Sequence, residues 1–229
     1  MKKFIVSIDA GTTSIRSILF DIKGKPIFSS QKEFTQYFPK NGWVEHDPDE
    51  IWLKTKKTLQ DVVYKAKKLK GKILTIGITN QRETTILWNK KTGKVVYKAI
   101  VWQDRRTEDF CKKLRSQNKE TTFFNKTGLL IDPYFSATKV KWILDNIPLA
   151  KKLMKNDNLL FGTIDCFLIW RLTKNQIHAT DATNASRTML YNIGTNKWDD
   201  GILKLLKIKK NILPKVKNCS DDFGSTHSS

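Results

Sequence analysis

The chain opens with three short apolar segments that are separated by turns. Residues 4–8, 15–20 and 26–29 are each predicted to form a β-strand, because each run is rich in apolar residues and ends at a polar or glycine-containing turn. Strands that follow one another through such short connections pair in antiparallel fashion. The pattern therefore predicts a sheet that opens with an antiparallel three-strand meander.

A long amphipathic helix is predicted after the meander. Asp47 suits the N-cap, Pro48 the first helical position, and Glu50 the matching position of a capping box. The apolar positions that recur at helical spacing are Ile51, Leu59, Val62, Val63, Ala66 and Leu69. Gly71 is expected to end this helix.

The remaining sequence alternates strands with a mostly helical second half. Strands are predicted at 73–79, 84–88 and 95–102, and short ones near 176–178 and 188–192. Helices are predicted at 105–118, 120–126, 136–146, 148–155, 163–172 and 198–207. Since no repeat, low-complexity linker or glycine-rich hinge interrupts this order, we predict one α/β domain with a mixed sheet and flanking helices.

The composition adds a strong positive charge. The 229 residues carry 42 Lys and Arg against 22 Asp and Glu, a formal net charge of +20. Such a charge favours an anionic partner such as nucleic acid, a membrane surface or a phosphorylated small molecule. However, only seven of the 42 are arginine, the residue on which base and phosphate recognition depends most. We therefore interpret the lysines mainly as a solvated surface and expect no nucleic-acid binding.

Neither targeting segments nor metal-binding patterns are evident. The apolar run at the N-terminus stops at Asp9, too short for a secretory signal. The longest apolar stretch, 159–170, contains Asp165 and is too short to insert into a membrane. The cysteines and histidines are widely spaced and favour neither disulfide bonds nor a zinc site. A reducing, cytoplasmic location is therefore expected. These cysteines and histidines are Cys111, Cys166, Cys219, His46, His178 and His227.

The first candidate motif lies between the first two predicted strands. Residues 9–14 read Asp-Ala-Gly-Thr-Thr-Ser, and Arg16 follows. Glycine in a tight turn lets backbone N–H groups approach an anion, and the hydroxyls add donors. Asp9 suits Mg²⁺ held through waters. A plain hairpin turn explains the motif equally well, and neither a P-loop nor a protein-kinase signature is present.

A second motif offers groups suited to a neutral polyol. Within residues 77–85, Arg82 donates hydrogen bonds and Glu83 accepts them, as sugar-like hydroxyls require. The alternative is a solvated ion pair on a loop, which is common and contributes little.

Three further segments contain candidate binding residues. Trp102 ends a predicted strand and would suit the wall of a sugar-sized pocket, while the following Asp104 would equally suit a helix N-cap. Tyr134 stands at a helix entrance, where helix-cap packing is the more common role. For the polar segment 180–187, which ends at Arg187, a structural role is favoured.

Taken together, these motifs resemble one family. In this order they are similar to the N-terminal part of the glycerol kinases, in the FGGY group of carbohydrate kinases. The matching segments are DAGTTSIR (9–16), GWVEHDPDEIW (42–52), IGITNQRETTILW (76–88), AIVWQDRRT (99–107), GLLIDPYFSATKVKWILDN (128–146), LLFGTIDCFLIWRLT (159–173) and TDATNASRTMLYNI (180–193). NQRETT and IDPYFS distinguish glycerol kinases from the wider group.

The resemblance implies an actin-like, ribonuclease H-like ATPase fold and transfer of the ATP γ-phosphate to a terminal hydroxyl of glycerol. It implies that Thr12, Thr13, Ser14 and Arg16 bind the ATP phosphates and that Asp9 is associated with Mg²⁺. It also implies that Arg82, Glu83 and Tyr134 bind the glycerol hydroxyls and that Trp102 forms an aromatic wall of that pocket.

The resemblance covers residues 4 to about 224, whereas family members run to about twice this length. Their general base is the Asp of a Gly-Asp-Gln motif, and this motif is absent from the sequence. We therefore expect residues 1–229 to be an FGGY-type N-terminal domain that lacks a C-terminal nucleotide-binding domain and has negligible activity alone. The alternatives are half of a split kinase with a separate C-terminal partner, or a non-catalytic gene fragment or basic binding module.

Overall fold

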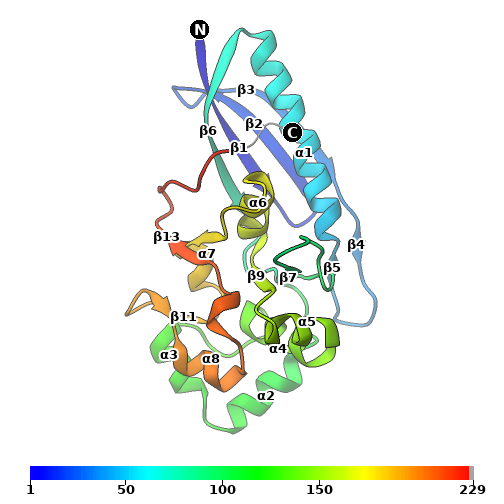
Figure 1. The fold of residues 1–229 in the computed structure, drawn as a ribbon, viewed down its shortest axis with the longest axis vertical. Coiled ribbons are helices and arrows are strands. Elements are labelled where there is room, and N and C mark those ends of the chain that lie inside the picture. Colours follow the sequence, from blue (N-terminus) through cyan, green and yellow to red (C-terminus); the bar gives the residue numbers. More distant parts are fainter. Residues whose placement is uncertain (227–229) are drawn as a thin grey trace. The chain divides into compact units, whose positions relative to one another are not determined.

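The computed structural model describes residues 1–226, which fold into two compact units (Figure 1). The first unit comprises Met1–Gln36 and Asp47–Gln81, and the second comprises Tyr37–His46 and the chain from Arg82 onward. The chain therefore passes from one unit to the other at three points.

The first unit contains a four-stranded mixed sheet in the order β3-β2-β1-β6. Its strands are β1 (Lys2–Ala10), β2 (Ser14–Asp21), β3 (Pro26–Glu33) and β6 (Gly71–Asn80). The pairs β1–β2 and β2–β3 are antiparallel, while β1 and β6 are parallel. The predicted meander and the mixed sheet are both confirmed.

Helix α1 (Pro48–Lys68) begins where the capping pattern predicts. The Asp47 side chain accepts hydrogen bonds from the backbone N–H groups of Asp49 and Glu50. The Glu50 carboxylate accepts from the N–H of Thr35 at 3.2 Å rather than from that of Asp47. The cap thus fixes the start of the helix, and Glu50 ties the first turn to the strand connection before it.

The helix ends differently from the prediction. The left-handed residue after α1 is Lys70, with φ 52°, and Gly71 is already the first residue of β6. A Cβ atom at Gly71 would lie 2.1 Å from Cε2 of Phe4. Gly71 is therefore required for close strand packing and does not cap the helix.

The second unit contains short strands and seven α-helices among its described residues. The strands are β5 (Glu45–His46), β7 (Ile86–Asn89), β8 (Ala99–Ile100), β9 (Leu159–Gly162), β10 (Ala179–Asp181), β11 (Tyr191–Asn192), β12 (Lys197–Trp198) and β13 (Lys215–Lys217). Strand β4 (Gln36–Tyr37) spans the boundary at which the chain passes from the first unit to the second. The helices are α2 (Glu108–Ser116), α3 (Glu120–Thr127), α4 (Ser136–Asn146), α5 (Pro148–Lys155), α6 (Ile164–Leu172), α7 (Ala182–Ser186) and α8 (Asp200–Leu206), with a 3₁₀ turn at Lys210–Ile212.

Most helices of this unit match the predicted ranges, and α4 and α5 match to the residue. Strand β9 was not predicted: its four buried residues pair antiparallel with β7 and continue into apolar α6. In a continuous apolar run, the spacing of apolar residues cannot distinguish a strand from a helix. The polar segment after β10 forms the short helix α7, and β10 lies three residues later than the strand predicted near 176–178.

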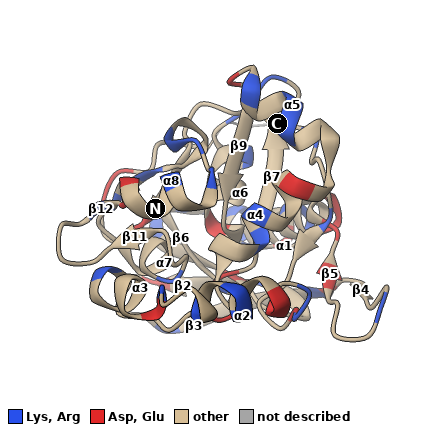
Figure 2. Cartoon of the chain, turned by 90° about the horizontal axis from the view of Figure 1, so that it is seen from below, with Lys and Arg blue, Asp and Glu red and all other residues tan. Residues whose placement is uncertain are grey.

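Basic side chains lie on many helices and loops, with acidic side chains among them (Figure 2). Among the described residues, Lys139 is the one lysine that is buried, with no exposed surface. In residues 1–226 no helix is both long enough and apolar enough to cross a bilayer.

Candidate functional site

The hairpin between β1 and β2 is a compact turn in the first unit. The N–H of Gly11 donates to the carbonyl of Ser14 at 3.0 Å, and the side-chain amide of Gln81 donates to the Gly11 carbonyl at 3.0 Å. A Cβ atom on Gly11 would lie 3.3 Å from the Ser14 oxygen, which is tight. The sequence places glycine where this turn has little room for a side chain.

The hydroxyl groups of this turn differ in exposure. Thr13 is exposed, while Thr12 and Ser14 are half-buried. The Gln36 side chain donates to the Thr12 carbonyl at 2.9 Å, and the Gln31 side chain donates to the Ser14 hydroxyl at 3.0 Å. Since neighbouring amides hold the turn, its hydroxyls project from a fixed frame.

Asp9 and Arg16 face each other across the β1–β2 pair. Arg16 Nη2 lies 2.9 Å from Asp9 Oδ2, and the two side chains are 46% and 36% exposed. Among residues 1–226, no group of three or more His, Cys, Asp or Glu side chains is placed to hold a metal ion. A Mg²⁺ ion at Asp9 would therefore take most ligands from phosphate oxygens and water, as Mg²⁺ commonly does.

Glu83 occupies an unusual backbone position in the second unit. Its φ is 63°, in the left-handed region, and only 2% of the residue is exposed. Its carbonyl accepts hydrogen bonds from the hydroxyls of Ser136 at 2.9 Å and Thr85 at 3.1 Å. A left-handed conformation costs a residue with a side chain about 1–2 kcal/mol. Such strain persists where neighbouring contacts hold it and is concentrated at functional sites. The preceding Arg82 is exposed.

The Glu83 carboxylate is paired with Arg187. Arg187 Nε donates to Glu83 Oε1 at 2.7 Å, and the Arg187 side chain is 36% exposed. The Arg187 guanidinium carbon also lies 5.0 Å from the ring centroid of Phe135 and 5.7 Å from that of Tyr134. Only a structural role was predicted for segment 180–187, and the pairing of Arg187 with Glu83 was not anticipated.

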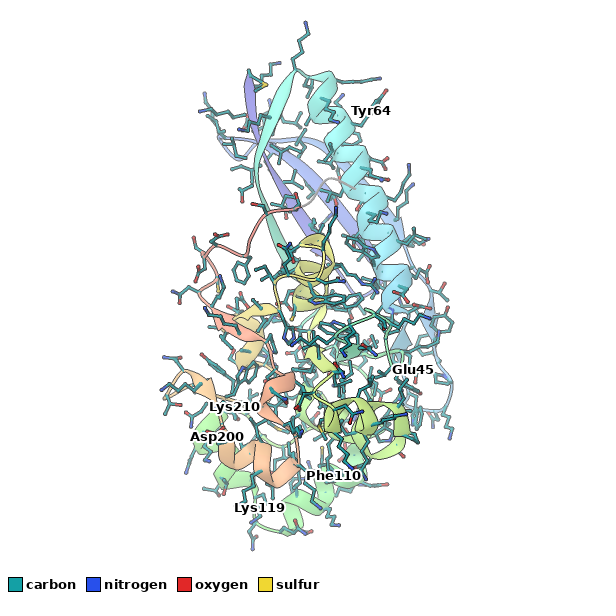
Figure 3. The ribbon with its side chains drawn as sticks, in the orientation of Figure 1. Glu45, Tyr64, Phe110, Lys119, Asp200 and Lys210 are labelled. Carbon is teal, nitrogen blue, oxygen red and sulfur yellow. The ribbon has the colours of Figure 1, made fainter. Side chains whose placement is uncertain are left out.

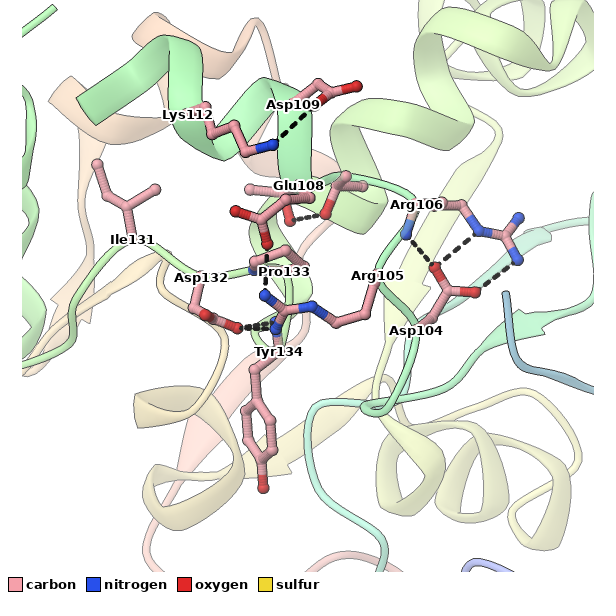
Figure 4. A network of polar contacts seen from close by, with 12 residues as sticks. Asp104, Arg105, Arg106, Glu108, Asp109, Lys112, Ile131, Asp132, Pro133 and Tyr134 are labelled. Atoms are coloured by element: carbon pink, nitrogen blue, oxygen red, sulfur yellow. Dashed lines mark hydrogen bonds and ion pairs between the residues drawn. The ribbon is translucent and has the colours of Figure 1, made fainter. Parts of the chain in front are cut away.

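Trp102 and Tyr134 form an aromatic pair. Their ring centroids are 5.4 Å apart and their planes are inclined at 58°. Asp132 Oδ1 accepts hydrogen bonds from the Tyr134 N–H at 2.8 Å and from Arg105 Nη1 at 2.9 Å. Figure 4 shows Arg105 reaching Asp132 while the Tyr134 ring points away from this ion pair. The turn before α4 is thus held by its own acidic residue.

Asp104 does not cap α2, whose N-cap is Thr107. Instead, its carboxylate is 1% exposed and accepts from the Val44 N–H at 2.6 Å and from Arg106 Nη2 at 2.8 Å. The Arg106 side chain is completely buried and also donates to Glu45 (labelled in Figure 3) at 2.8 Å. This buried ion pair fixes the backbone two residues after Trp102.

The structure therefore brings together Glu83, Trp102 and Tyr134 and adds Arg187, from four separate segments of the second unit. These groups suit a small neutral polyol. The carboxylate can accept hydrogen bonds from hydroxyl groups, the guanidinium groups can donate them, and the aromatic faces can contact C–H groups. Arg82 follows Gln81, the last residue of the first unit, and directly precedes Glu83 in the chain. The hairpin residues belong to the first unit.

Comparison with known proteins establishes the class. Residues 4–229 match the N-terminal domain of the FGGY family of carbohydrate kinases, and the chain belongs to this family. FGGY carbohydrate kinases have an actin-like ATPase fold, so the predicted fold class is confirmed.

Curated relatives are named glycerol kinases. The chain is 53% identical over 223 residues to the glycerol kinase of Bradyrhizobium sp. (strain ORS 278), covering 97% of this chain and 45% of that protein. It is 55% identical over 224 residues to the glycerol kinase of Malacoplasma penetrans, covering 98% of this chain and 44% of that protein. The chain thus spans less than half the length of the relatives it matches.

Solved structures of carbohydrate kinases have the same fold as this chain. The Plasmodium falciparum glycerol kinase with ADP superposes with a TM-score of 0.94 at 36% identity, covering 99% of this chain and 45% of that one. The gluconate kinase of Lactobacillus acidophilus superposes with a TM-score of 0.83 at 29% identity, covering 95% of this chain and 42% of that one.

Proposed function

We propose that this chain contributes the glycerol-binding site and part of the phosphate site of a glycerol kinase, which phosphorylates glycerol to glycerol 3-phosphate with ATP. The names of its relatives and its FGGY membership support glycerol as the substrate. The observation that carries the proposal is the ion pair between the buried Glu83 and the partly exposed Arg187, beside the Trp102–Tyr134 ring pair.

In this proposal Glu83 accepts hydrogen bonds from two glycerol hydroxyls, and the exposed guanidinium of Arg82 donates to their oxygens. Trp102 contacts the carbon chain, and the Tyr134 hydroxyl binds one further oxygen. Because Glu83 is almost fully buried, each hydrogen bond it makes to glycerol forms in a medium of low polarity, where it is stronger than in water.

On the nucleotide side, Thr12, Thr13 and Ser14 bind ATP phosphates through hydroxyl and backbone N–H groups, with Arg16 nearby. Asp9 and the phosphate oxygens are a ligand set that suits Mg²⁺. When bound, the ion neutralises charge on the phosphates. The protein's part in phosphoryl transfer is then mainly to position the acceptor hydroxyl and the γ-phosphate.

We further propose that residues 1–229 alone have negligible kinase activity, since they match only about 45% of the relatives. Phosphoryl transfer also requires a base near the acceptor hydroxyl, and loss of a general base costs roughly 10²–10⁴ in rate. A second polypeptide that supplied such a base and further ATP-binding residues would be a partner of this chain. ATP-dependent formation of glycerol 3-phosphate by the purified 229-residue chain, lost on Glu83→Ala, would contradict the inactivity.

Substrate choice is tested with a panel of ligands. Isothermal titration of the purified chain with glycerol, gluconate and xylulose at equal concentrations separates a glycerol site from the sites that the gluconate and xylulose kinases imply. We expect a saturable heat of binding with glycerol and none with gluconate or xylulose. Binding of gluconate or xylulose in preference to glycerol would refute the substrate assignment.

A further inference from the structure

Lys139 is buried in the first turn of α4 and holds the preceding turn. Its Nζ lies 2.7 Å from the carbonyl oxygen of Pro133, 2.6 Å from that of Tyr134 and 3.3 Å from that of Phe135. An ammonium group has three N–H donors, and here three carbonyls are available to take one each. The side chain extends back toward the helix N-terminus, as side chains on helices do.

The same turn of α4 also holds Glu83. The hydroxyl of Ser136, the first residue of α4, donates to the Glu83 carbonyl at 2.9 Å. Side chains from residues 136–139 thus hydrogen-bond both to Glu83 and to the turn that carries Tyr134. One helical turn supports two parts of the candidate polyol site.

Burying a lysine in this way is costly, because an ammonium ion leaves water and an apolar residue of the same shape would avoid the penalty. Burial lowers the Lys139 pKa from 10.5 to about 7. The groups that face it and oppose this shift are Asp104, Glu83, Cys111 and Asp132. Because burying this charge destabilises the fold, packing alone does not explain a lysine at this position.

We propose that Lys139 is a positioning residue for the polyol site: its ammonium group fixes residues 133–135 so that Tyr134 meets the substrate beside Trp102. This inference rests on the proposed function, because it assigns the turn to glycerol binding. When Lys139 loses its proton, one donor is lost and a lone pair faces a carbonyl. The turn then loosens and glycerol binding weakens.

The test compares Lys139→Met with Lys141→Met, a matched control on the same helix whose ammonium group pairs with Asp145 instead. Glycerol affinity is measured by isothermal titration from pH 6 to pH 9. Loss of hydrogen bonds from a charged donor predicts about 10-fold weaker binding for Lys139→Met and little change for Lys141→Met. In the unaltered chain, affinity should fall as the pH rises past about 7, and this dependence should vanish in Lys139→Met.

A second readout does not depend on glycerol. In chain labelled with ¹³C-tyrosine, the Tyr134 ring signal is assigned with Tyr134→Phe. Its chemical shift should change near pH 7, as Lys139 loses its proton, and should differ in Lys139→Met. If Lys139→Met fails to fold, Lys139→Gln and the pH titration of the unaltered chain decide the question. An unaltered chain that binds no glycerol refutes the proposed function, while the Tyr134 signal still tests the positioning. Equal glycerol affinity in both chains at every pH, or a Tyr134 signal that neither the pH nor the substitution moves, would overturn the positioning role.

Discussion

The carboxylate of Glu83 and the guanidinium of Arg187 meet at 2.7 Å although 104 residues separate them in the chain. Glu83 is held in a left-handed conformation within the loop that follows β6, and Arg187 caps the C-terminal end of the short helix α7. The pair aligns a buried acceptor with a partly exposed donor next to two aromatic rings. It is the feature on which the proposed glycerol site depends most.

Arg187→Ala should weaken glycerol binding and destabilise the chain. Without its partner, the Glu83 carboxylate is left buried and unpaired, which costs about 1–3 kcal/mol in the free energy of unfolding. We expect glycerol affinity to fall about 10-fold. Urea denaturation and isothermal titration measure the two effects.

The control for this substitution is Lys210→Ala, which removes an exposed pair with Asp200 (both labelled in Figure 3). An exposed ion pair contributes about 0–1 kcal/mol, so this variant should unfold at nearly the same urea concentration. Equal losses in both variants would show that the Glu83–Arg187 pair has no special role.

Arg106 and Arg105 are neighbours in sequence with opposite environments. The Arg106 side chain is completely buried and paired with Asp104 and Glu45, whereas the Arg105 side chain is 50% exposed. Replacing Arg106 by Met leaves two buried carboxylates without their counter-charge. We expect a loss of about 3–5 kcal/mol in the free energy of unfolding.

Arg105→Met is the matched comparison. Its ion pairs with Glu108 and Asp132 are exposed on the arginine side, so we expect a loss of about 0–1 kcal/mol. Chemical denaturation of the two variants measures both losses in the free energy of unfolding. A loss in Arg105→Met as large as that in Arg106→Met would contradict the assignment of the buried pair as the structural one.

Acid should destabilise the chain through two histidines. Burial lowers the pKa of both His46 and His178 from 6.5 to about 4. Between these values the unfolded chain binds protons that the folded chain does not. The free energy of unfolding should therefore fall as the pH drops from about 6.5 to about 4, by on the order of 3 kcal/mol for each histidine.

Urea titrations at pH 7, 5.5 and 4 measure this dependence. In His178→Gln the part of the acid sensitivity due to His178 should disappear, because glutamine does not titrate. If the unaltered chain and His178→Gln lose stability in parallel over this range, His178 does not carry the effect. His227 lies outside the described residues.

Local signals in the sequence predicted much of the fold. The Asp47 cap and Pro48 fixed the start of α1, and α4 and α5 were predicted to the residue. Strand β9 was missed because its pairing with β7 is a tertiary contact, and nothing in an unbroken apolar run distinguishes it from the helix that follows.

The candidate site was predicted less completely. Arg82, Glu83, Trp102 and Tyr134 lie in recognisable motifs, and their assignment to glycerol remains a prediction. Lys139 was missed because Lys139 and Lys141 look alike in the sequence, and only the folded chain shows that one is buried and the other pairs with Asp145.

The most direct test of the proposed site is glycerol titration of the unaltered chain and of Glu83→Gln by calorimetry. Glutamine keeps the size of the side chain but removes its negative charge. The side chain then no longer forms an ion pair with Arg187, and one of the two oxygens that would accept hydrogen bonds from glycerol is replaced by an NH₂ donor. Glu50→Gln, at a carboxylate of the first unit that pairs with Lys54 on α1, is the matched control.

We predict saturable binding to the unaltered chain, similar binding to Glu50→Gln, and at least about 10-fold weaker binding to Glu83→Gln. A folded unaltered chain that binds no glycerol, or a Glu83→Gln variant that binds it as tightly as the unaltered chain, would contradict the proposed site.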